Sequence, residues 1–309
     1  MVENGSSQGL LALTAPWAAA ARALESARED RLFDDPWASA LAGADGAAWL
    51  AQSPPEGVAL IAVRTRFFDD YLLRIVQEDG VRQVVILAAG LDTRAFRLEW
   101  PASMQVFEMD QGAVLERKQT ILDQAGAKPT CERHVIAADL ADGWEASLTT
   151  AGIDSAQPTI WLLEGFLFYL SPEDLAALLG RVMKASSPGS YLAFDAINSA
   201  TLTSPFTQPW VEMQARAGAP WTGTLDDPKA LLKRHGWKAE LTQIGSPGAE
   251  YGRWPYPSAP EDDDPEAPHL WLATARRPYR IGEGASDQAQ PGQAGPGASP
   301  LLLPLRKRP

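Results

Sequence analysis

The sequence predicts an α/β fold in which a mostly parallel, seven-stranded, Rossmann-like sheet carries helices on both faces. Between residues 80 and 275, short apolar runs rich in β-branched residues alternate with helical patterns, as is typical of βαβ units. Several runs, such as 84–87 and 160–163, are apolar at every position, as expected of strands covered on both faces. Glycine and acidic residues follow the runs, at the positions where open α/β sheets bind ligands.

Seven runs are predicted to be the strands of this sheet. Each is short and is bounded by turn-forming or helical sequence. In chain order they cover residues 83–89, 104–109, 133–137, 159–163, 190–195, 238–242 and 270–275.

Capping residues mark two of the helices that connect the strands. At 171–174 the sequence Ser-Pro-Glu-Asp places a hydroxyl at the N-cap, proline at the first position and acids in the first turn. Asp227 and Pro228 open a second helix, and Gly236 ends it.

The same patterns divide the chain into three parts. Three helical segments before the first strand, at 14–25, after Asp35-Pro36 and at 57–76, predict an N-terminal helical cap or lid. A segment rich in aromatic residues and glycine, at about 200–226, interrupts the later strands and is predicted to help cover a substrate pocket. Its aromatic residues could instead be satellite core. The three parts are the cap at 1–79, the ligand-binding domain at 80–280 and a disordered tail at 281–309.

Composition argues against several classes of function. The net charge of −12 repels phosphate backbones and anionic membranes, so we do not expect a nucleic-acid partner. Cys131 alone cannot form an internal disulfide, and the three histidines lack the close spacing of a metal site. No apolar run approaches the roughly 20 residues that cross a bilayer. We therefore expect a cytoplasmic protein without a metal or a membrane partner.

The turn after the first strand is the sharpest local signal. Small residues at 88–90 let a ligand approach the backbone, although an ordinary strand-to-helix turn would look similar. A dinucleotide site would need Gly-x-Gly-x-x-Gly here, and only Gly90 is present. S-adenosylmethionine has no phosphate and needs no such loop, so it is favoured over NAD. Glu108 and Asp110 stand about 20 residues later, at the usual spacing for an acid that binds a ribose diol.

Further acids end the later strands. Asp139, next to Leu140, follows the third strand, Glu164 ends the fourth and Asp195 ends the fifth. Any one of them could be a helix cap or a loop residue. Together, carboxylates along one edge of a sheet predict a polar ligand with several hydrogen-bond donors.

Four motifs, read in order along the chain, resemble the leucine carboxyl methyltransferase-like family. They are RTRFFDDYL at 64–72, AGLDTR at 89–94, FEMD at 107–110 and EGFLFYL at 164–170. TAPW at 14–17 and RLFDDP at 31–36 are similar to an actinobacterial branch of that family, which includes polyketide carboxyl methyltransferases. The resemblance covers roughly residues 10–277.

The resemblance implies a class I methyltransferase fold that binds S-adenosyl-L-methionine. The family's cofactor contacts fall on Arg64, Gly90, Asp110, Asp139, Leu140 and Glu164, and Glu108 remains a second candidate for the ribose. Arg64 would pair with the carboxylate of the cofactor. The family also uses an N-terminal lysine; this chain has none before Lys118, so Arg22 is the candidate substitute.

The resemblance further implies O-methylation of a carboxylate, on a polyketide-type small molecule or, alternatively, on a peptide C-terminus. An ionised carboxylate needs no general base, because positioning and desolvation supply the acceleration. We expect Tyr169 and Arg64 near the methyl-transfer site, with the Tyr169 hydroxyl orienting the acceptor; a core role for this aromatic is the alternative. Two competing classes of protein stay open at this point, a non-catalytic cofactor-binding protein and a nicotinamide-dependent oxidoreductase.

Overall fold

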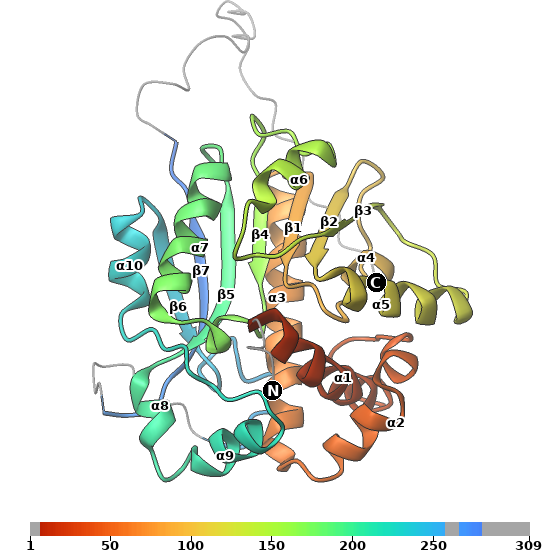
Figure 1. Ribbon diagram of the computed structural model, residues 1–309, viewed down its shortest axis with the longest axis vertical. Helices are drawn as coiled ribbons and strands as arrows, with labels where there is room; N and C mark the ends of the chain where they lie inside the picture. The colour runs from red at the N-terminus through yellow and green to blue at the C-terminus, as the bar shows by residue number, and fades with distance from the viewer. Residues whose placement is uncertain (1–6, 257–265, 280–309) are drawn as a thin grey trace, which may run out of the picture. The chain divides into compact units, whose positions relative to one another are not determined.

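The strands form one mixed sheet of seven strands in the order β3-β2-β1-β4-β5-β7-β6 (Figure 1). The computed structural model describes residues 7–256 and 266–279. Strands β1 to β5 are parallel, and β7 runs antiparallel to both β5 and β6. The strands are β1 Gln83–Leu87, β2 Gln105–Asp110, β3 Glu132–Ala137, β4 Ile160–Leu163, β5 Tyr191–Ile197, β6 Lys238–Gln243 and β7 Leu270–Arg276.

The direction of strand order reverses between β1 and β4. In the central strand β1, Val84 pairs with Val106 of β2 on one side and with Ile160 of β4 on the other. Chain connections leave toward opposite edges of the sheet from this point, so the carboxyl ends of β1 and β4 leave a crevice in which open α/β sheets bind ligands.

Helices cover both faces of the sheet. They are α1 Ser7–Ser26, α2 Ala38–Leu50, α3 Pro55–Glu78, α4 Arg94–Arg97, α5 Gly112–Gln124, α6 Trp144–Thr150, α7 Pro172–Ala185, α8 Ser199–Thr203, α9 Gln208–Arg216 and α10 Pro228–Arg234, with a 3-10 turn η1 at Leu167–Tyr169. None of the helices in the described ranges combines the length and the apolar character that crossing a membrane requires.

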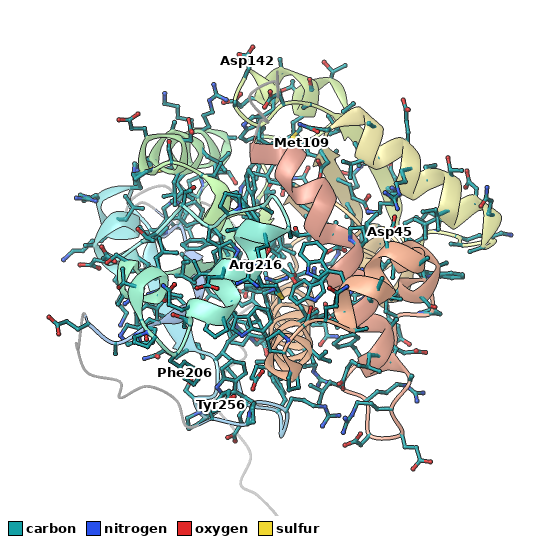
Figure 2. The ribbon with its side chains drawn as sticks, turned by 60° about the horizontal axis from the view of Figure 1, so that its bottom comes forward. Asp45, Met109, Asp142, Phe206, Arg216 and Tyr256 are labelled. Atoms are coloured by element: carbon teal, nitrogen blue, oxygen red, sulfur yellow. The ribbon has the colours of Figure 1, made fainter. Side chains whose placement is uncertain are left out.

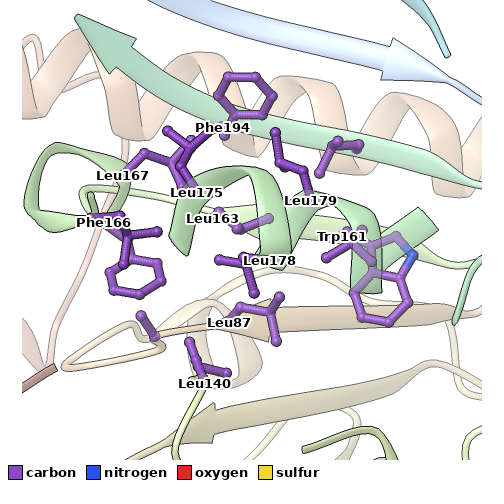
Figure 3. Packing of buried hydrophobic residues seen from close by; sticks show 14 of the residues in the cluster. Leu87, Leu140, Trp161, Leu163, Phe166, Leu167, Leu175, Leu178, Leu179 and Phe194 are labelled. Atoms are coloured by element: carbon purple, nitrogen blue, oxygen red, sulfur yellow. The ribbon is translucent and has the colours of Figure 1, made fainter. Parts of the chain in front are cut away.

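A separate hydrophobic core lies on each face. On one face, Leu175, Leu178 and Leu179 of α7 pack against Leu87 and Trp161 of the central strands (Figure 3). This is the apolar stripe expected of an amphipathic helix that covers a sheet. On the other face α3 covers the sheet in the same way, contributing Phe68, Leu72 and Ile75 among other residues.

The fold predicted from the sequence is confirmed, and all seven strands lie within two residues of their predicted limits. β1 ends at Leu87 instead of 89, because Ala88 and Gly90 have φ values of 53° and 46°, which turn the backbone out of the sheet. The predicted N-cap is confirmed: the Ser171 hydroxyl accepts a hydrogen bond from the Asp174 N–H at 3.1 Å.

The predicted parts of the chain map unevenly onto this fold. Within the predicted cap at 1–79, α3 is itself one of the helices that cover the sheet: the Tyr71 hydroxyl donates to the Ala275 carbonyl of β7 at 3.3 Å. The predicted insertion at 200–226 contains α9 and most of α8. The predicted tail at 281–309 lies outside the described residues.

Candidate functional site

A cavity lies beside the carboxyl ends of β1 and β4. α1 and α3 form one wall, the turns after the two strands form the floor, and residues of η1, α9 and the segment after α9 close the opposite side. The lining consists of Thr14, Ala15, Trp17, Ala18, Arg22, Leu60, Ile61, Arg64, Ile86, Ala88, Ala89, Gly90, Leu91, Asp92, Glu164, Gly165, Phe168, Tyr169, Gln214 and Trp221. Figure 2 shows α9, marked by Arg216, next to α1 at this end of the molecule.

The turn after β1 is held by a buried carboxylate. Asp110 is fully buried, and its Oδ2 accepts a hydrogen bond from the Gly90 N–H at 2.7 Å, while its Oδ1 accepts from the Gln111 N–H at 2.7 Å. Burial raises the pKa of Asp110, and the two hydrogen bonds oppose that rise. Gly90 adopts a left-handed φ of 46°, which glycine tolerates without a Cβ clash. The turn therefore presents bare backbone to the cavity.

Arg64 projects from α3 into the carboxyl end of the sheet. Its Nε lies 2.9 Å from Oε1 of Glu164, and its Nη1 lies 2.7 Å from Oδ2 of Asp195. Burial alone would lower the pKa of Arg64, but the two carboxylates outweigh it and raise that pKa. The Gly165 N–H donates to Asp195 Oδ1 at 2.7 Å, which fixes this carboxylate from a second side.

Arg94 extends the same ion-pair network below the cavity floor. It is 2% exposed, contacts Asp69 at 2.7 Å and Glu164 Oε2 at 2.7 Å, and also pairs with Asp92. Burial is the largest single influence on Asp92 and opposes its ionisation, but the charge of Arg94, with Lys118, Arg97 and the hydrogen bond from the Arg94 N–H, outweighs it and the pKa of Asp92 falls to about 2. Burial likewise opposes ionisation of Glu164, and the guanidiniums of Arg94 and Arg64 bring its pKa below the ordinary value.

The charges of this network do not cancel. Arg97 joins the network through Asp69, at 2.6 Å. The network then holds three guanidiniums and four carboxylates, which are those of Arg64, Arg94, Arg97, Asp69, Asp92, Glu164 and Asp195. With all four carboxylates ionised, the network carries one net formal negative charge beside the cavity, in surroundings that screen it weakly. A ligand that carries a positive charge suits this floor better than an anion does.

The opposite side of the cavity is aromatic and uncharged. Phe168 and Trp221 have ring centroids 5.2 Å apart, and Tyr169 is 6% exposed. Burial raises the pKa of the Tyr169 phenol, although hydrogen bonding with the Thr14 side chain opposes the rise. Gln214 of α9 completes this side. The cavity thus has an ion-paired half and a half of aromatic rings with neutral polar groups.

The structure brings five of the predicted site residues together. Arg22, Arg64, Gly90, Glu164 and Tyr169 all line the cavity. Arg22 is held there by Asp35 at 2.8 Å and by the Leu91 carbonyl at 2.7 Å. Their roles toward a cofactor or an acceptor stay predictions.

The remaining predicted residues do not line the cavity. Asp110 lies directly behind Gly90, Asp139 is exposed and accepts a hydrogen bond from the Ala141 N–H at 2.9 Å, and Leu140 packs in the core at 4% exposure. Glu108 is fully buried, with its Oε2 2.6 Å from Lys118 Nζ and 2.7 Å from Arg133 Nη2. Glu108 is therefore a buried ion-pair partner of these two cations, a role that its position in the sequence does not reveal.

Sequence reasoning missed several residues of the site. Asp195 was visible as an acid at a strand end, and Trp221 as an aromatic of the insertion, but neither was named as a site residue. Phe206, also in the insertion, lies 60% exposed against Tyr256, away from the cavity lining (Figure 2). Gln214 carried no sequence signal, because its place depends on how α9 docks.

Comparison with known proteins decides the family. A model of the leucine carboxyl methyltransferase family matches residues 15–183, more than half of the chain. The chain belongs to the leucine carboxyl methyltransferase family. Two relatives, both provisionally named S-adenosyl-L-methionine-dependent methyltransferases, come from Saccharopolyspora erythraea and Streptomyces coelicolor. The first is 41% identical over 260 residues, covering 78% of this chain and 88% of the relative; the second is 40% identical over 263 residues, covering 81% and 91%.

Solved structures in the same comparison share the fold. A DUF574 family protein from Streptomyces avermitilis has a TM-score of 0.55 at 17% identity, covering 76% of this chain and 91% of that one. A provisionally named methyltransferase from Thermobifida fusca has a TM-score of 0.50 at 19% identity, covering 76% and 89%. The leucine carboxyl methyltransferase family therefore supplies the enzyme class, and these structures support the class I methyltransferase architecture.

Proposed function

We propose that this chain, an S-adenosyl-L-methionine-dependent methyltransferase by family and relatives, methylates a carboxylate oxygen of a small molecule. The cavity beside the carboxyl ends of β1 and β4 has a charged half that suits the cofactor and an aromatic half that suits an apolar acceptor. A peptide C-terminal carboxylate is the second candidate, and it is favoured by the description of the family model.

One observation carries the choice of a carboxylate acceptor: the described lining of the cavity has no strong candidate for a general base that would deprotonate a hydroxyl or an amine near neutral pH. It contains no histidine, cysteine or lysine. Asp92 and Glu164 are held ionised by Arg94, with lowered pKa values, and the pKa of Tyr169 is raised. A hydroxyl or amine acceptor would need to lose a proton, whereas a carboxylate arrives ionised. The lining therefore supports an acceptor that needs no deprotonation.

The residues of the charged half fit the proposed cofactor. Arg64, which is buried, and Glu164, which is partly buried, are suited to the cofactor's carboxylate and ammonium groups, and Gly90 leaves the backbone open to close approach. The remaining negative charge of the floor suits a sulfonium. When bound, S-adenosyl-L-methionine supplies a methyl group that a carboxylate oxygen can take to give a methyl ester.

The chain's own contribution is to position and desolvate the acceptor. Phe168 and Trp221 present ring surface that excludes water, and a carboxylate stripped of water is a stronger nucleophile toward a cationic centre. Tyr169, protonated at neutral pH, can donate a hydrogen bond that orients the acceptor oxygen. The reaction neutralises both charges, so weakly polar surroundings favour it.

Contacts between α1 and α9 support a small acceptor over a protein. Trp17 of α1 and Trp210 of α9 meet edge to face, with ring centroids 6.0 Å apart. Trp210 also lies against Gly57 of α3, where an added Cβ would be 2.1 Å from the indole. These contacts hold α9 against α1 and α3 beside the cavity, and we take this packing to favour a small acceptor over a protein.

The test is a turnover panel with radiolabelled methyl donor. Carboxylic acids, phenols, amines and short peptides are compared, and alkaline hydrolysis of each product releases methanol only from methyl esters. We expect base-labile product from small carboxylic acids and a kcat/KM that is flat between about pH 6.5 and 9, since the acceptor is ionised throughout that range. Base-stable product, or a rate that rises with a pKa in that range, would contradict a carboxylate acceptor.

A further inference from the structure

Gln214 is buried in the cavity wall with an unsatisfied amide. The residue is 2% exposed and lines the cavity, yet its Oε1 has no hydrogen-bond partner within the described chain. A buried polar atom without a partner costs free energy, so a protein retains one chiefly where something else completes it. This amide lies opposite the charged half of the cavity, among the aromatic residues.

The surroundings of Gln214 define what can complete it. Phe168 and Trp221, on the same side of the cavity, supply flat ring surfaces, and Trp17, Leu60 and Ile61 of the wall formed by α1 and α3 supply further apolar surface. The Trp221 indole N–H is also buried and makes no hydrogen bond of good geometry within the described residues, although the Tyr169 hydroxyl is its neighbour. This half of the cavity therefore offers neutral hydrogen-bonding groups between apolar walls.

We infer that Gln214 recognises a hydroxyl group carried by a flat, aromatic carboxylic acid, which names the substrate class of the methyl transfer. The inference rests on the proposed function for the carboxylate and adds a second polar group on the acceptor. An ionised carboxylate has no proton and cannot donate to Oε1, so an acceptor that completes this amide does so through another of its groups. A hydroxyl both donates and accepts. It can therefore pair with the side-chain amide of Gln214 whether the amide oxygen or the amide nitrogen faces it.

Recognition of this kind discriminates strongly between related acids. A site built around a buried hydrogen-bonding group rejects the analogue that lacks the matching hydroxyl, because the protein group is left unpaired and dehydrated. Apolar walls alone would accept both acids about equally. Hydroxylated and parent acids of the same ring system are therefore the informative pair.

The experiment measures binding and turnover with matched acids. The probes are benzoate and 2-naphthoate, each compared with its derivatives bearing one hydroxyl at successive ring positions. Binding is measured by calorimetry on the full chain saturated with S-adenosylhomocysteine, and turnover is followed by mass spectrometry of the products. Gln214→Leu is compared with Gln124→Leu, which removes an exposed amide on α5.

We expect at least one hydroxylated acid to bind the wild type about 10-fold or more tighter than its parent. Gln214→Leu is expected to abolish that preference and leave the parent's affinity unchanged or improved, while Gln124→Leu keeps the preference. The melting temperature of Gln214→Leu should equal or exceed that of the wild type, because the substitution removes an unpaired buried polar atom. A structural hydrogen bond at Gln214 would lower it.

Three results would overturn the inference. They are equal binding of every hydroxylated acid and its parent, a preference that survives Gln214→Leu, and no binding of any probe. Failure of the proposed function is separate: a hydroxylated acid that binds through Gln214 but is methylated on the hydroxyl supports the recognition and refutes carboxylate transfer.

Discussion

Replacing Arg64 by methionine removes the cation that lies between two carboxylates, the partly buried Glu164 and the fully buried Asp195. The arginine is 8% exposed and lies 2.9 Å from Glu164 and 2.7 Å from Asp195. In the variant, Glu164 keeps its ion pair with Arg94, whereas Asp195 is left with the hydrogen bond from the Gly165 N–H. One fully buried carboxylate is therefore deprived of its counterion.

The expected cost is large for a single substitution. Removing one partner of a buried ion pair destabilises proteins by about 3–5 kcal/mol, because the remaining charge is buried without compensation. Arg74→Met, on the same helix, is the matched control: its side chain is 55% exposed and 3.9 Å from Glu78. An exposed pair contributes about 1 kcal/mol or less. Denaturant unfolding at about pH 8, followed by far-UV circular dichroism, measures both free energies.

The cost of losing Arg64 should also depend on pH. Burial holds the pKa of Asp195 above its ordinary value, and Arg64 opposes that rise, so the variant's folded-state pKa is higher still. The folded variant then binds a proton more tightly than the unfolded chain does. Its deficit is full above the folded-state pKa and shrinks as the pH falls through it. A cost equal to that of Arg74→Met, or one that stays constant down to about pH 5, would refute the reasoning.

Two further substitutions test the aromatic half of the cavity. Tyr169→Phe removes only the hydroxyl, and we expect kcat to fall about 10-fold or more with the affinity for S-adenosyl-L-methionine unchanged; an unchanged kcat on the true acceptor would assign Tyr169 to the core. Gly57→Ala places a Cβ 2.1 Å from the Trp210 indole, so this ring must move, and we expect α9 to move with it; kcat/KM for the acceptor should then fall while cofactor affinity is kept. Gly180→Ala, a helical site with open space around it, is the control and should stabilise the protein by about 0.5–1 kcal/mol; equal kinetics in the two alanine variants would contradict the proposed role of α9.

The sheet could be predicted from the sequence because each strand carries a recognisable local pattern of residues. The run from Val84 to Leu87 is apolar at every position, and such a run fits a strand covered on both faces whatever the rest of the chain does. The exact end of β1 was not predictable in this way. It is set by a positive φ at Ala88, a backbone conformation that alanine seldom adopts and that the local sequence does not predict.

The site was predictable where residues sit at strand ends or in family motifs, and unpredictable where long-range pairing decides. Gly90 and Glu164 lie in the turns that follow two strands meeting at the switch point, so their common cavity follows from topology. Glu108 has the spacing of a ribose-binding acid, but Lys118 of α5 and Arg133 of β3 fold back onto it. Nothing in the order of residues reveals such partners.

Calorimetric titration of the chain with S-adenosyl-L-methionine, alongside S-adenosylhomocysteine and NAD, tests the central claim most directly. The account predicts that one molecule of each nucleoside sulfur compound binds per chain, with no heat from NAD. It also predicts that Glu164→Gln binds S-adenosyl-L-methionine about 10-fold or more weakly than the wild type does, because a charge-assisted hydrogen bond is lost. Absence of binding by the wild type, or equal affinities in the wild type and Glu164→Gln, would contradict the assignment of this cavity to the methyl donor.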